Sequence, residues 1–586
     1  MIGLDSLPET ILVPRTDPIY NCHGYLTKVP IGAIQPFIEA FTDPDDLVVD
    51  FFAGSGMTGL AALTLNRRAR LSDISVLGQH IARGYLTRTE QRALESAARE
   101  AVGAAKDALG SLYLTQRDDG SEVEMVRTVW SFTYECPSCE YELIYLEHLD
   151  ERGRAPTACP NCQGPFARRN WTRGADVPML AVVRQDTGRQ MEKPVSDYDR
   201  TQLSKASKDA RLADIPSQVI DSSREMFSRS GLGKSGMTET RMFFSDRNAI
   251  ALLELWRAIE SNPSADLRQK LRFAFTAILP RASKRYQWSA KRPLNAQNQT
   301  YYIAPVYYEW NVFELFERKV NAANKATKVL YGEGQLFGRP GDVTYELASA
   351  ENLAHLDNES VDYVFTDPPF GSNIFYSDMN LFHEAWLGMV TDHASEAVVH
   401  TTGSRKSGAE ARYEALLRSA FQEALRVLKP GKLMSVVFGN SSGRIWGLVQ
   451  RALRDAGFKA APVHVAILDK GQRSVKGLNS GSESVVTVDL IVTVQKPAEG
   501  ERADDATELA NGDTAELLSS AIAELPEEEA RNPSHVYARI LRKAIQRHLT
   551  LDALHLSDVL IALRNNGYAV DRKTGLLSKS EEAAAA

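Results

Sequence analysis

The stretch VVDFFAGSGMTG, from Val48 to Gly59, decides the fold. An apolar run ends at Asp50, a turn rich in glycine follows, and GLAALTLNRRA then has helical spacing. A second short apolar segment, ARLSDIS, contains Asp73. Buried strand, glycine turn, helix and strand in this order are typical of a parallel sheet covered by helices. The sequence therefore predicts an α/β fold with a doubly wound, Rossmann-like sheet.

The glycine turn also predicts a ligand site. Gly54 and Gly56 allow the backbone to approach a ligand closely, and the following helix presents unpaired N–H groups. Asp73 follows at the distance where doubly wound sheets place an acid that binds a ribose hydroxyl. The alternative is a tight turn without a ligand. The sequence lacks GxxxxGK[ST], which argues against a P-loop, whereas the incomplete GxGxxG pattern leaves a dinucleotide enzyme open at this point.

A second motif, Asp367-Pro368-Pro369-Phe370, follows the apolar strand VDYVFT. Ligands of open α/β sheets bind beyond the carboxyl ends of the strands, which is where this turn is expected. The two prolines stiffen the backbone and fix the direction of the carbonyl between them. The Asp367 carboxylate and a proline carbonyl can accept both hydrogens of a planar amino group, while Phe370 can stack on a base. The alternative is a proline-rich turn with an exposed aromatic ring.

With both motifs in view, the chain resembles the amino-methylating DNA methyltransferases, the N6-adenine and N4-cytosine group. The resemblance covers roughly residues 20–80 and 340–495. It implies a methyltransferase sheet, S-adenosylmethionine as cofactor, DNA as partner and direct methyl transfer to a flipped base. Asp at the first position of the tetrapeptide is more usual for adenine N6, and Ser for cytosine N4. One departure is that the insertion begins just after Asp73, before the SAENL segment (349–353).

The same resemblance implies roles for individual residues. The tetrapeptide Asp367, Pro368, Pro369 and Phe370 would be catalytic and hold the target base. Lys28 and Pro30, in HGYLTKVPIGAIQPFIEAFT, would lie near the methionine end of the cofactor, and the SAENL segment would flank its adenine. The full set of cofactor residues implied is Lys28, Pro30, Asp50, Phe51, Ala53, Gly54, Gly56, Thr58, Asp73, Glu351 and Asn352.

Four of the five cysteines form two tight pairs, Cys136-Pro-Ser-Cys139 and Cys159-Pro-Asn-Cys162. The spacing C-x2-C-x19-C-x2-C lies within the zinc-ribbon range. Four thiolates give a closed tetrahedral site without an open position for catalysis. We therefore predict a structural zinc ribbon; the alternative is a ribbon that no longer binds metal.

Residues 267–308 contain eight Lys or Arg, eight aromatic residues and no Asp or Glu. Cations neutralise phosphates and aromatic faces stack on bases, so this stretch is a candidate for nucleic-acid contact. The alternative is a partly buried helix followed by a solvated basic loop. The candidates for contact are Arg281, Lys284, Arg285, Tyr286, Trp288, Lys291 and Arg292.

These patterns divide the chain into five parts. We expect a catalytic domain in 20–115 and 340–496, a zinc ribbon in 120–175, a helical insertion for nucleic-acid recognition in 176–339, a linker in 497–516 and a small helical module in 517–586. The last region has no function assigned from the sequence. The acidic composition of the linker and its lack of large apolar residues favour an extended segment.

Composition limits the class of protein. The 586 residues are 43% hydrophobic and 24% charged, with a formal net charge of −7, as in ordinary globular proteins of several domains. No apolar run is long enough for a membrane span, and the N-terminus lacks the features of a signal peptide, so we expect a cytoplasmic protein.

Four alternative functions stay open at this level: a cytosine N4 enzyme, an RNA base methyltransferase, a catalytically silent DNA-binding subunit of a defence or modification complex, and a Rossmann dehydrogenase. The last is disfavoured because the proline pair has no role in hydride transfer. A restriction or phage-defence partner protein is compatible with the sequence but not identified by it.

Overall fold

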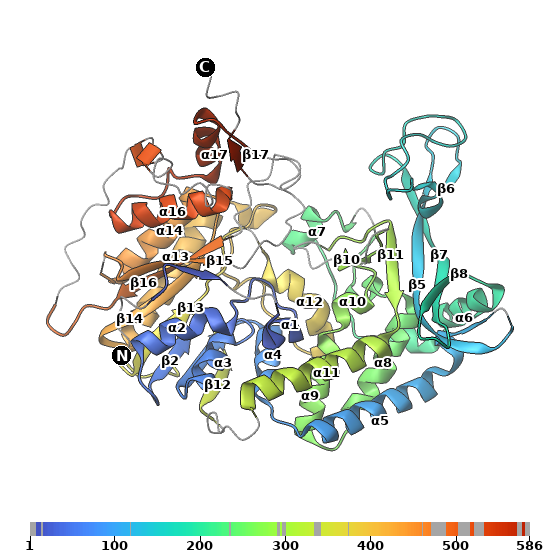
Figure 1. Ribbon diagram of the computed structural model, residues 1–586, viewed down its shortest axis with the longest axis horizontal. Coiled ribbons are helices and arrows are strands. Elements are labelled where there is room, and N and C mark those ends of the chain that lie inside the picture. Colours follow the sequence, from blue (N-terminus) through green and yellow to red (C-terminus); the bar gives the residue numbers. More distant parts are fainter. Residues whose placement is uncertain are drawn as a thin grey trace.

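The computed structural model describes residues 7–579, except 13–15, 118, 234–235, 290–293, 296–300, 333–340, 373, 460, 470–487, 502–515, 518, 521–531 and 571–576. Lys291, Arg292 and most of the expected linker fall outside the described residues. Figure 1 shows two parts: a helix-covered sheet that carries both ends of the chain, and a second part from which a long β-arm projects.

The first part is an eight-stranded sheet of order β1-β15-β16-β14-β13-β2-β3-β12. From β2 the chain moves through β3 to β12 at one edge, and from β13 through β14 toward the other edge, so the direction reverses between β2 and β13. Apart from the antiparallel β16, neighbouring strands run parallel. The strands are β1 (Thr10–Leu12), β2 (Leu47–Asp50), β3 (Arg68–Asp73), β12 (Val343–Leu347), β13 (Val361–Thr366), β14 (Leu428–Phe438), β15 (His464–Asp469) and β16 (Val488–Gln495).

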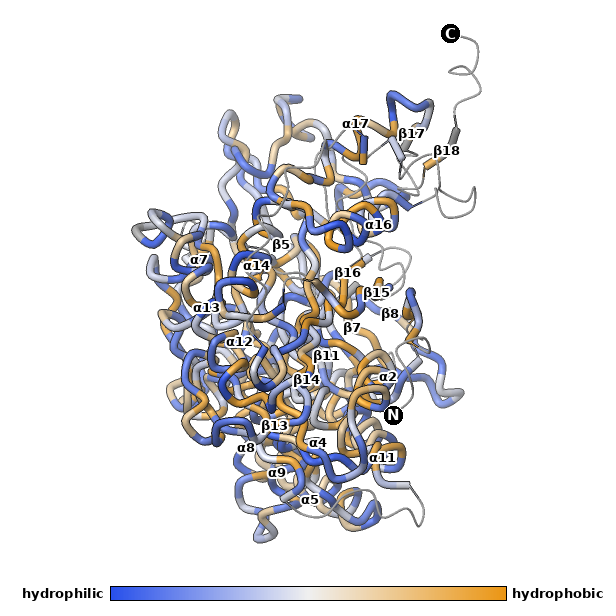
Figure 2. Tube along the Cα trace, turned by 90° about the vertical axis from the view of Figure 1, so that its left-hand side faces the viewer, coloured by the Kyte–Doolittle hydropathy of each residue, from blue (hydrophilic) through white to orange (hydrophobic). Residues whose placement is uncertain are grey.

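Helices cover both faces of this sheet. Val48 and Tyr363 face one core, whereas their neighbours Val49 and Val364 face the other, as the period of two in a strand requires. The first core packs against α2 (Ile31–Phe41), α3 (Met57–Thr64) and α4 (Val76–Leu86), and the second against α13 (Ala409–Val427) and α14 (Gly443–Ala456). Apolar segments are concentrated along the central strands and α2 (Figure 2). The expectation of a mixed α/β fold is therefore confirmed.

The second part is built on an antiparallel sheet of order β10-β9-β11-β5-β7-β8. Its long strands β5 (Glu122–Glu135) and β7 (Thr172–Arg184) form the arm that projects at the right of Figure 1. The other strands are β4 (Leu114–Gln116), β6 (Glu142–Ile144), β8 (Gln190–Pro194), β9 (Tyr286–Gln287), β10 (Leu294–Asn295) and β11 (Val306–Trp310). The helices are α5 (Gln91–Leu109), α6 (Asp197–Ser207), α7 (Glu225–Arg229), α8 (Asp246–Glu260), α9 (Ala265–Thr276), α10 (Leu279–Ala282) and α11 (Val312–Tyr331).

The expectation of a helical insertion over 176–339 was wrong in part. Besides its helices, this region contains β8, β9 and β11, and β11 pairs with β5, so that Val306 lies opposite Ser131. The β5–β7 arm and the insertion thus share one sheet and one core. All five residues of β11 are buried. A short apolar run without alternation cannot be distinguished from a buried helix by periodicity alone.

The C-terminal residues contain α16 (Pro533–Gln546) and α17 (Leu556–Asn565), followed by the strand pair β17 (Tyr568–Val570) and β18 (Leu577–Lys579), which the sequence did not predict. The module packs on the eight-stranded sheet β1-β15-β16-β14-β13-β2-β3-β12 rather than standing apart from it, since its apolar residues share a core with α13 and α14. The N–H of Leu556 donates to the Ser441 carbonyl at 3.0 Å, and Gln450 donates through Nε2 to the Leu549 carbonyl at 2.9 Å.

Candidate active site and metal centre

A cleft of about 910 Å³, open solvent at its mouth included, lies at the carboxyl ends of β2, β3 and β13. The chain direction reverses at this point of the sheet, which is where open α/β sheets bind their ligands. Of the predicted catalytic and cofactor residues, all of them described, nine line the cleft: Lys28, Asp50, Phe51, Ala53, Gly54, Thr58, Asp73, Asp367 and Pro369. The glycine turn and the tetrapeptide therefore open onto one shared space.

The glycine turn is fixed in place by Asp73. The Gly54 N–H donates to Oδ2 of Asp73 at 2.8 Å, while the Ser75 N–H donates to Oδ1 at 2.9 Å. The Tyr345 hydroxyl donates to the Gly54 carbonyl at 2.7 Å. Burial raises the pKa of Asp73, and the backbone N–H donors oppose that shift. Asp73 thus holds the turn with the same carboxylate that was predicted to meet a ribose.

Gly54 and Gly56 have different roles. Gly54 has φ +45°, and a Cβ there would lie 2.8 Å from Cε1 of Tyr25, so glycine is needed beside the cleft. Gly56 has φ +80° and does not line the cleft; a Cβ there would lie 2.7 Å from that of Ala82 on α4. Gly56 therefore serves helix packing.

Asp50 ties three elements together beneath the cleft. Its carboxylate accepts hydrogen bonds from the hydroxyls of Thr58 on α3, at 2.7 Å, and Thr366 on β13, at 2.8 Å. The backbone N–H of Phe52 adds a third bond at 3.1 Å. Burial is the largest influence and raises the pKa of Asp50 to about 7 despite these donors.

Only part of the tetrapeptide lines the cleft. Asp367 and Pro369 line the cleft, whereas Pro368 and Phe370 do not. The Pro369 carbonyl accepts hydrogen bonds from the Tyr413 hydroxyl at 2.5 Å and the Gly371 N–H at 3.0 Å. The Phe370 ring packs edge-on against Phe438, with centroids 5.1 Å apart. This packing does not support Phe370 as a base platform, because its ring is directed to the hydrophobic core.

Aromatic residues that the sequence analysis missed form a wall of the cleft. The rings of Tyr25 and Tyr376 stack with centroids 6.2 Å apart, and the hydroxyls of Tyr376 and Thr27 are 2.5 Å apart. Ser75 accepts hydrogen bonds from the hydroxyl of Tyr25 at 3.2 Å and from Nδ2 of Asn380 at 3.1 Å. In the sequence, the aromatic residues near the two motifs were the signal that could have identified this wall.

Glu396 is a further missed residue that lines the cleft. It accepts hydrogen bonds from the N–H groups of Tyr376, at 2.5 Å, and Ser377, at 3.2 Å, at the start of α12 (Tyr376–Leu387). Burial raises its pKa to about 7. The carboxyl group thus fixes the end of the helix that carries Tyr376.

Four predicted cofactor residues have other surroundings. The Lys28 side chain lines the cleft but is buried, and its Nζ donates to the His23 carbonyl at 2.6 Å. Pro30 precedes α2 as its N-cap. Glu351 and Asn352 are exposed and outside the cleft, and their place in its lining is taken by Ser349 and Ala350. Within the predicted SAENL segment (349–353), Ser349 and Ala350 therefore line the cleft, whereas Glu351 and Asn352 do not.

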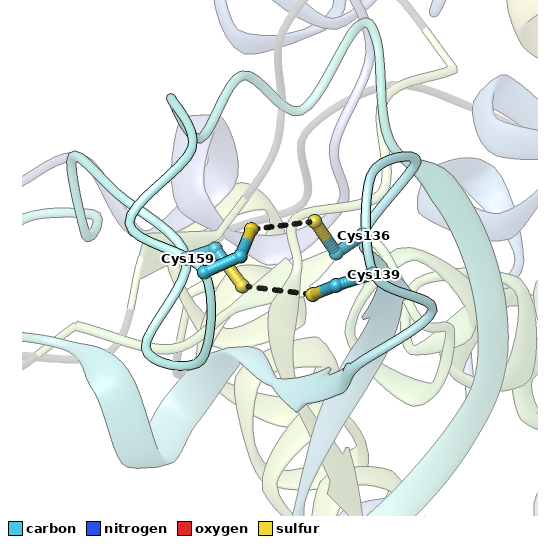
Figure 3. Close-up of side chains that lie close together, drawn as sticks. Cys136, Cys139 and Cys159 are labelled. Carbon is cyan, nitrogen blue, oxygen red and sulfur yellow. Dashed lines mark hydrogen bonds between the residues drawn. The ribbon is translucent and has the colours of Figure 1, made fainter.

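The four paired cysteines meet at the end of the β-arm, with all Sγ atoms within 4.8 Å of one another (Figure 3). Sγ of Cys136 lies 3.7 Å from that of Cys162, and Sγ of Cys139 lies 3.7 Å from that of Cys159. Tetrahedral zinc with Zn–S bonds of about 2.3 Å requires sulfurs about 3.8 Å apart. These distances fit a zinc ion and exceed a disulfide bond of about 2.05 Å.

The two cysteine turns have the same backbone geometry. In each, the residue after the second cysteine is left-handed: Glu140 with φ +58° and Gln163 with φ +60°. The N–H of that residue donates to the carbonyl of the first cysteine, at 2.9 Å in one turn and 3.0 Å in the other. Two matched turns that direct four thiols to one point support a metal centre.

The acid-free stretch 267–308 is largely structural. Arg285 is 3% exposed and its guanidinium lies over the Tyr301 ring at 5.5 Å, so its proposed phosphate contact was wrong. Tyr286 and Trp288 are half-buried against the core, and Lys284 forms an ion pair with Asp176 at 3.3 Å. Arg281 is exposed. Burial of the apolar helix face withdrew the neighbouring cations from solvent.

The fold and the cleft define a class: an α/β protein with an open cleft at the switch point of a doubly wound sheet. Residues 14–91, which include the glycine turn, match the family model described as DNA methylase, of the N6/N4 type. The similarity to the N6/N4 DNA methylases is limited to this segment. Among the described residues, no helix combines the length and apolar character needed to cross a bilayer.

Individual relatives share only part of the chain. Over 42 residues it is 52% identical to the Escherichia coli (strain K12) protein named "Putative methylase YubD", covering 7% of this chain and 18% of that protein. The "Putative DNA Modification Methylase" TTHA0409 of Thermus thermophilus, complexed with S-adenosyl-L-methionine, is 18% identical, with 31% of this chain and 60% of that chain covered at a TM-score of 0.17. A Methanosarcina mazei SAM-dependent methyltransferase is 10% identical, with 30% and 78% covered at 0.16. Scores this low define no shared fold.

Proposed function

We propose that the protein is an S-adenosylmethionine-dependent DNA methyltransferase that modifies an exocyclic amino group, adenine N6, of a base turned out of its helix. The observation that carries the proposal is the shared cleft: the Gly54 turn and the Asp367 corner line the same space. A methyl donor on one side and an amino group on the other can meet there. The family match on residues 14–91 supports the same chemistry.

The cleft fits the cofactor on three counts. Its glycine turn lies between Tyr25 and the end of β3, where no side chain could replace the Gly54 hydrogen without a clash. Asp73 at the end of β3 offers carboxylate oxygens to ribose hydroxyls in addition to its backbone bonds. Apolar walls from Phe51, Ile34 and Met57 exclude water from the remaining space. When bound, the sulfonium supplies an electrophilic methyl group.

Asp367 acts on the amino group of the base. Its carboxylate accepts one N–H, which orients the nitrogen lone pair toward the methyl carbon. During methyl transfer the amino nitrogen would gain positive charge, and the Asp367 carboxylate would stabilise that charge. The amino proton is then lost to Asp367 or to water. Most of the rate gain comes from positioning the two reactants in a site with little water.

A substitution at Asp367 tests the proposal. Asp367→Ala should lower methyl transfer to DNA at least 100-fold, because both the N–H acceptor and the stabilising charge are lost, while S-adenosylmethionine binds with unchanged affinity. Incorporation of tritiated methyl groups and calorimetric binding measure the two effects. Ser395→Ala, an exposed position at the edge of the same cleft, is the matched control. Turnover retained by Asp367→Ala would refute the assignment.

The identity of the base and the polymer is tested separately. Mass spectrometry of nucleosides from methylated DNA should show N6-methyladenine rather than N4-methylcytosine. Competition with tRNA and rRNA distinguishes an RNA enzyme, which would prefer those polymers. A wild-type protein that binds DNA but not S-adenosylmethionine would instead be a silent DNA-binding subunit of a larger complex.

For the metal centre, we propose that Cys136, Cys139, Cys159 and Cys162 hold one structural zinc ion. Four thiolates close the tetrahedron, so the ion takes no part in methyl transfer.

A further inference from the structure

An exposed basic and aromatic surface leads from the catalytic corner to the zinc-ribbon arm. It consists of Arg229 at the end of α7, Tyr302 and Arg168, which we call the basic track. All three side chains are exposed, Tyr302 to 40%. We propose that the basic track binds the DNA backbone beside the flipped base, an inference that rests on the proposed function.

The track begins at the rim of the active site. Nη1 of Arg229 donates to the Ser372 carbonyl at 3.2 Å, two residues beyond Phe370 of the tetrapeptide. Its guanidinium also lies over the Phe375 ring at 5.3 Å. When a base of DNA enters the cleft at Asp367, the phosphates next to that base must lie along this rim.

Hydrogen bonds connect the three segments into one surface. Ser230, next to Arg229, accepts a hydrogen bond from the N–H of Tyr301 at 3.3 Å. Tyr302 follows Tyr301, and its hydroxyl accepts a hydrogen bond from Nη1 of Arg168 at 3.2 Å. These bonds hold the segments of Arg229, Tyr302 and Arg168 together, and α7 lies between the helix-covered sheet and the arm in Figure 1.

The track is anchored on the helix that follows the tetrapeptide. Asp378 of α12 accepts hydrogen bonds from Arg224, at 3.1 Å, and from the Met226 N–H, at 2.9 Å, which fixes α7. The Tyr301 hydroxyl donates to the Asp378 carbonyl. Both anchors are buried, so the exposed residues are presented at fixed positions and lose little freedom on binding.

The chemistry of the track suits a nucleic-acid strand. Within the described part of the chain, neither Arg168 nor Arg229 forms an ion pair with a carboxylate, so both charges are available to phosphates. Tyr302 between them offers an aromatic face to a base or sugar. An exposed arginine that touches only carbonyl, hydroxyl and aromatic groups gains more from a phosphate than one already neutralised by an acid.

The inference can be tested with the full chain and a fluorescein-labelled DNA duplex. Anisotropy titrations over a range of salt concentrations should show that the double substitution Arg168→Ala with Arg229→Ala weakens binding about 10- to 100-fold. The slope of log K against log salt should fall by about 2, since each phosphate contact contributes roughly 0.9. Tyr302→Ala should weaken binding about tenfold by loss of stacking.

Controls separate this inference from the proposed function. Arg99→Ala, on the exposed side of α5 and away from the track, should bind DNA as the wild type does. The corresponding Lys variants should retain most of the affinity, because they keep the charge. Cofactor affinity should be unchanged in every variant.

Each outcome has a distinct meaning. If the wild type methylates DNA but the double variant binds like the wild type, or if the Lys variants are as weak as the Ala variants, the basic track is not a phosphate surface. If the wild type shows neither DNA binding nor methyl transfer, the proposed function itself fails. Cofactor binding that is weakened in the Ala variants but not in the Lys variants would also refute the proposal for the basic track. It would mean that both arginines act in the cleft.

Discussion

Asp50 shows how a single buried carboxyl group can set the pH dependence of stability. Its pKa is raised to about 7 in the folded chain, against 3.8 as the ordinary value. The folded state thus binds the proton more tightly, so the contribution of this group to stability is greatest below about pH 4. It declines as the pH rises to about 7, and the full cost of ionisation is on the order of 4 kcal/mol.

Asp50→Asn should remove this dependence. Between pH 5 and pH 8 the free energy of unfolding of the wild type should fall by about 2–3 kcal/mol more than that of the variant. Urea unfolding at both pH values measures the difference. Glu396, whose pKa is also about 7, titrates equally in both proteins and cancels. Parallel pH profiles for the two proteins would show that Asp50 is not protonated near neutrality.

Gly54 is expected to control cofactor affinity. Gly54→Ala forces a left-handed alanine into contact with Tyr25, which costs about 1–2 kcal/mol and displaces the wall of the cleft. S-adenosylmethionine should therefore bind at least tenfold more weakly in calorimetry. Gly32→Ala, in α2 with nothing within 4 Å of the added carbon, is the matched control. Equal affinities for all three proteins would place the ligand elsewhere.

At the scale of the element, we expect the tip of the β5–β7 arm to depend on the proposed metal ion. Between β5 and β7 the chain forms the short strand β6 and a 3-10 helix (Tyr145–His148), and the four cysteine Sγ atoms meet within 4.8 Å of one another. Metal ligands supply folding free energy to such small units.

Cys139→Ser together with Cys162→Ser should abolish bound zinc, which elemental analysis should find at about one ion per wild-type chain. Proteolysis between residues 136 and 171 should then accelerate at least tenfold, because the apo ribbon opens. Cys22→Ser is the control, since this buried thiol lies outside the cluster. Zinc retained by the double variant would contradict the assignment of the ligands.

At the scale of the whole molecule, the C-terminal module is held by close backbone packing. A Cβ on Gly443 would lie 2.2 Å from the Leu551 carbonyl oxygen and 2.4 Å from that of Leu554. Nearby, Arg451 forms an ion pair with Asp552 at 3.0 Å. The module is thus a covering layer of the catalytic sheet.

Gly443→Ala should destabilise the protein by about 2–3 kcal/mol through overpacking and undocking of α16 and α17. Gly103→Ala, in α5 with nothing within 4 Å, should stabilise it by up to about 1 kcal/mol through helix propensity. Thermal and urea unfolding measure the stability of both variants against that of the wild type. If Gly443→Ala left the free energy of unfolding unchanged, the module would have to shift without a loss of stability.

By itself the sequence determined the features that local chemistry specifies. The turn after Asp50, the position of Asp367 after β13 and the two cysteine turns follow from residue types at short spacing, and the structure places them as predicted. Glycine, proline and cysteine constrain the backbone or the ligand wherever they occur, so these motifs need no tertiary information.

Only the tertiary structure decided what each side chain faces. Thr27 meets Tyr376 across 349 residues, and β11 pairs with β5 across most of the insertion. No local pattern encodes such contacts. Arg285 is turned into the core and the half-buried Phe370 ring packs against Phe438, although their residue types suggested a phosphate and a base. The physical reason is that burial is settled by the packing of distant elements, whereas periodicity reports only on the segment that contains it.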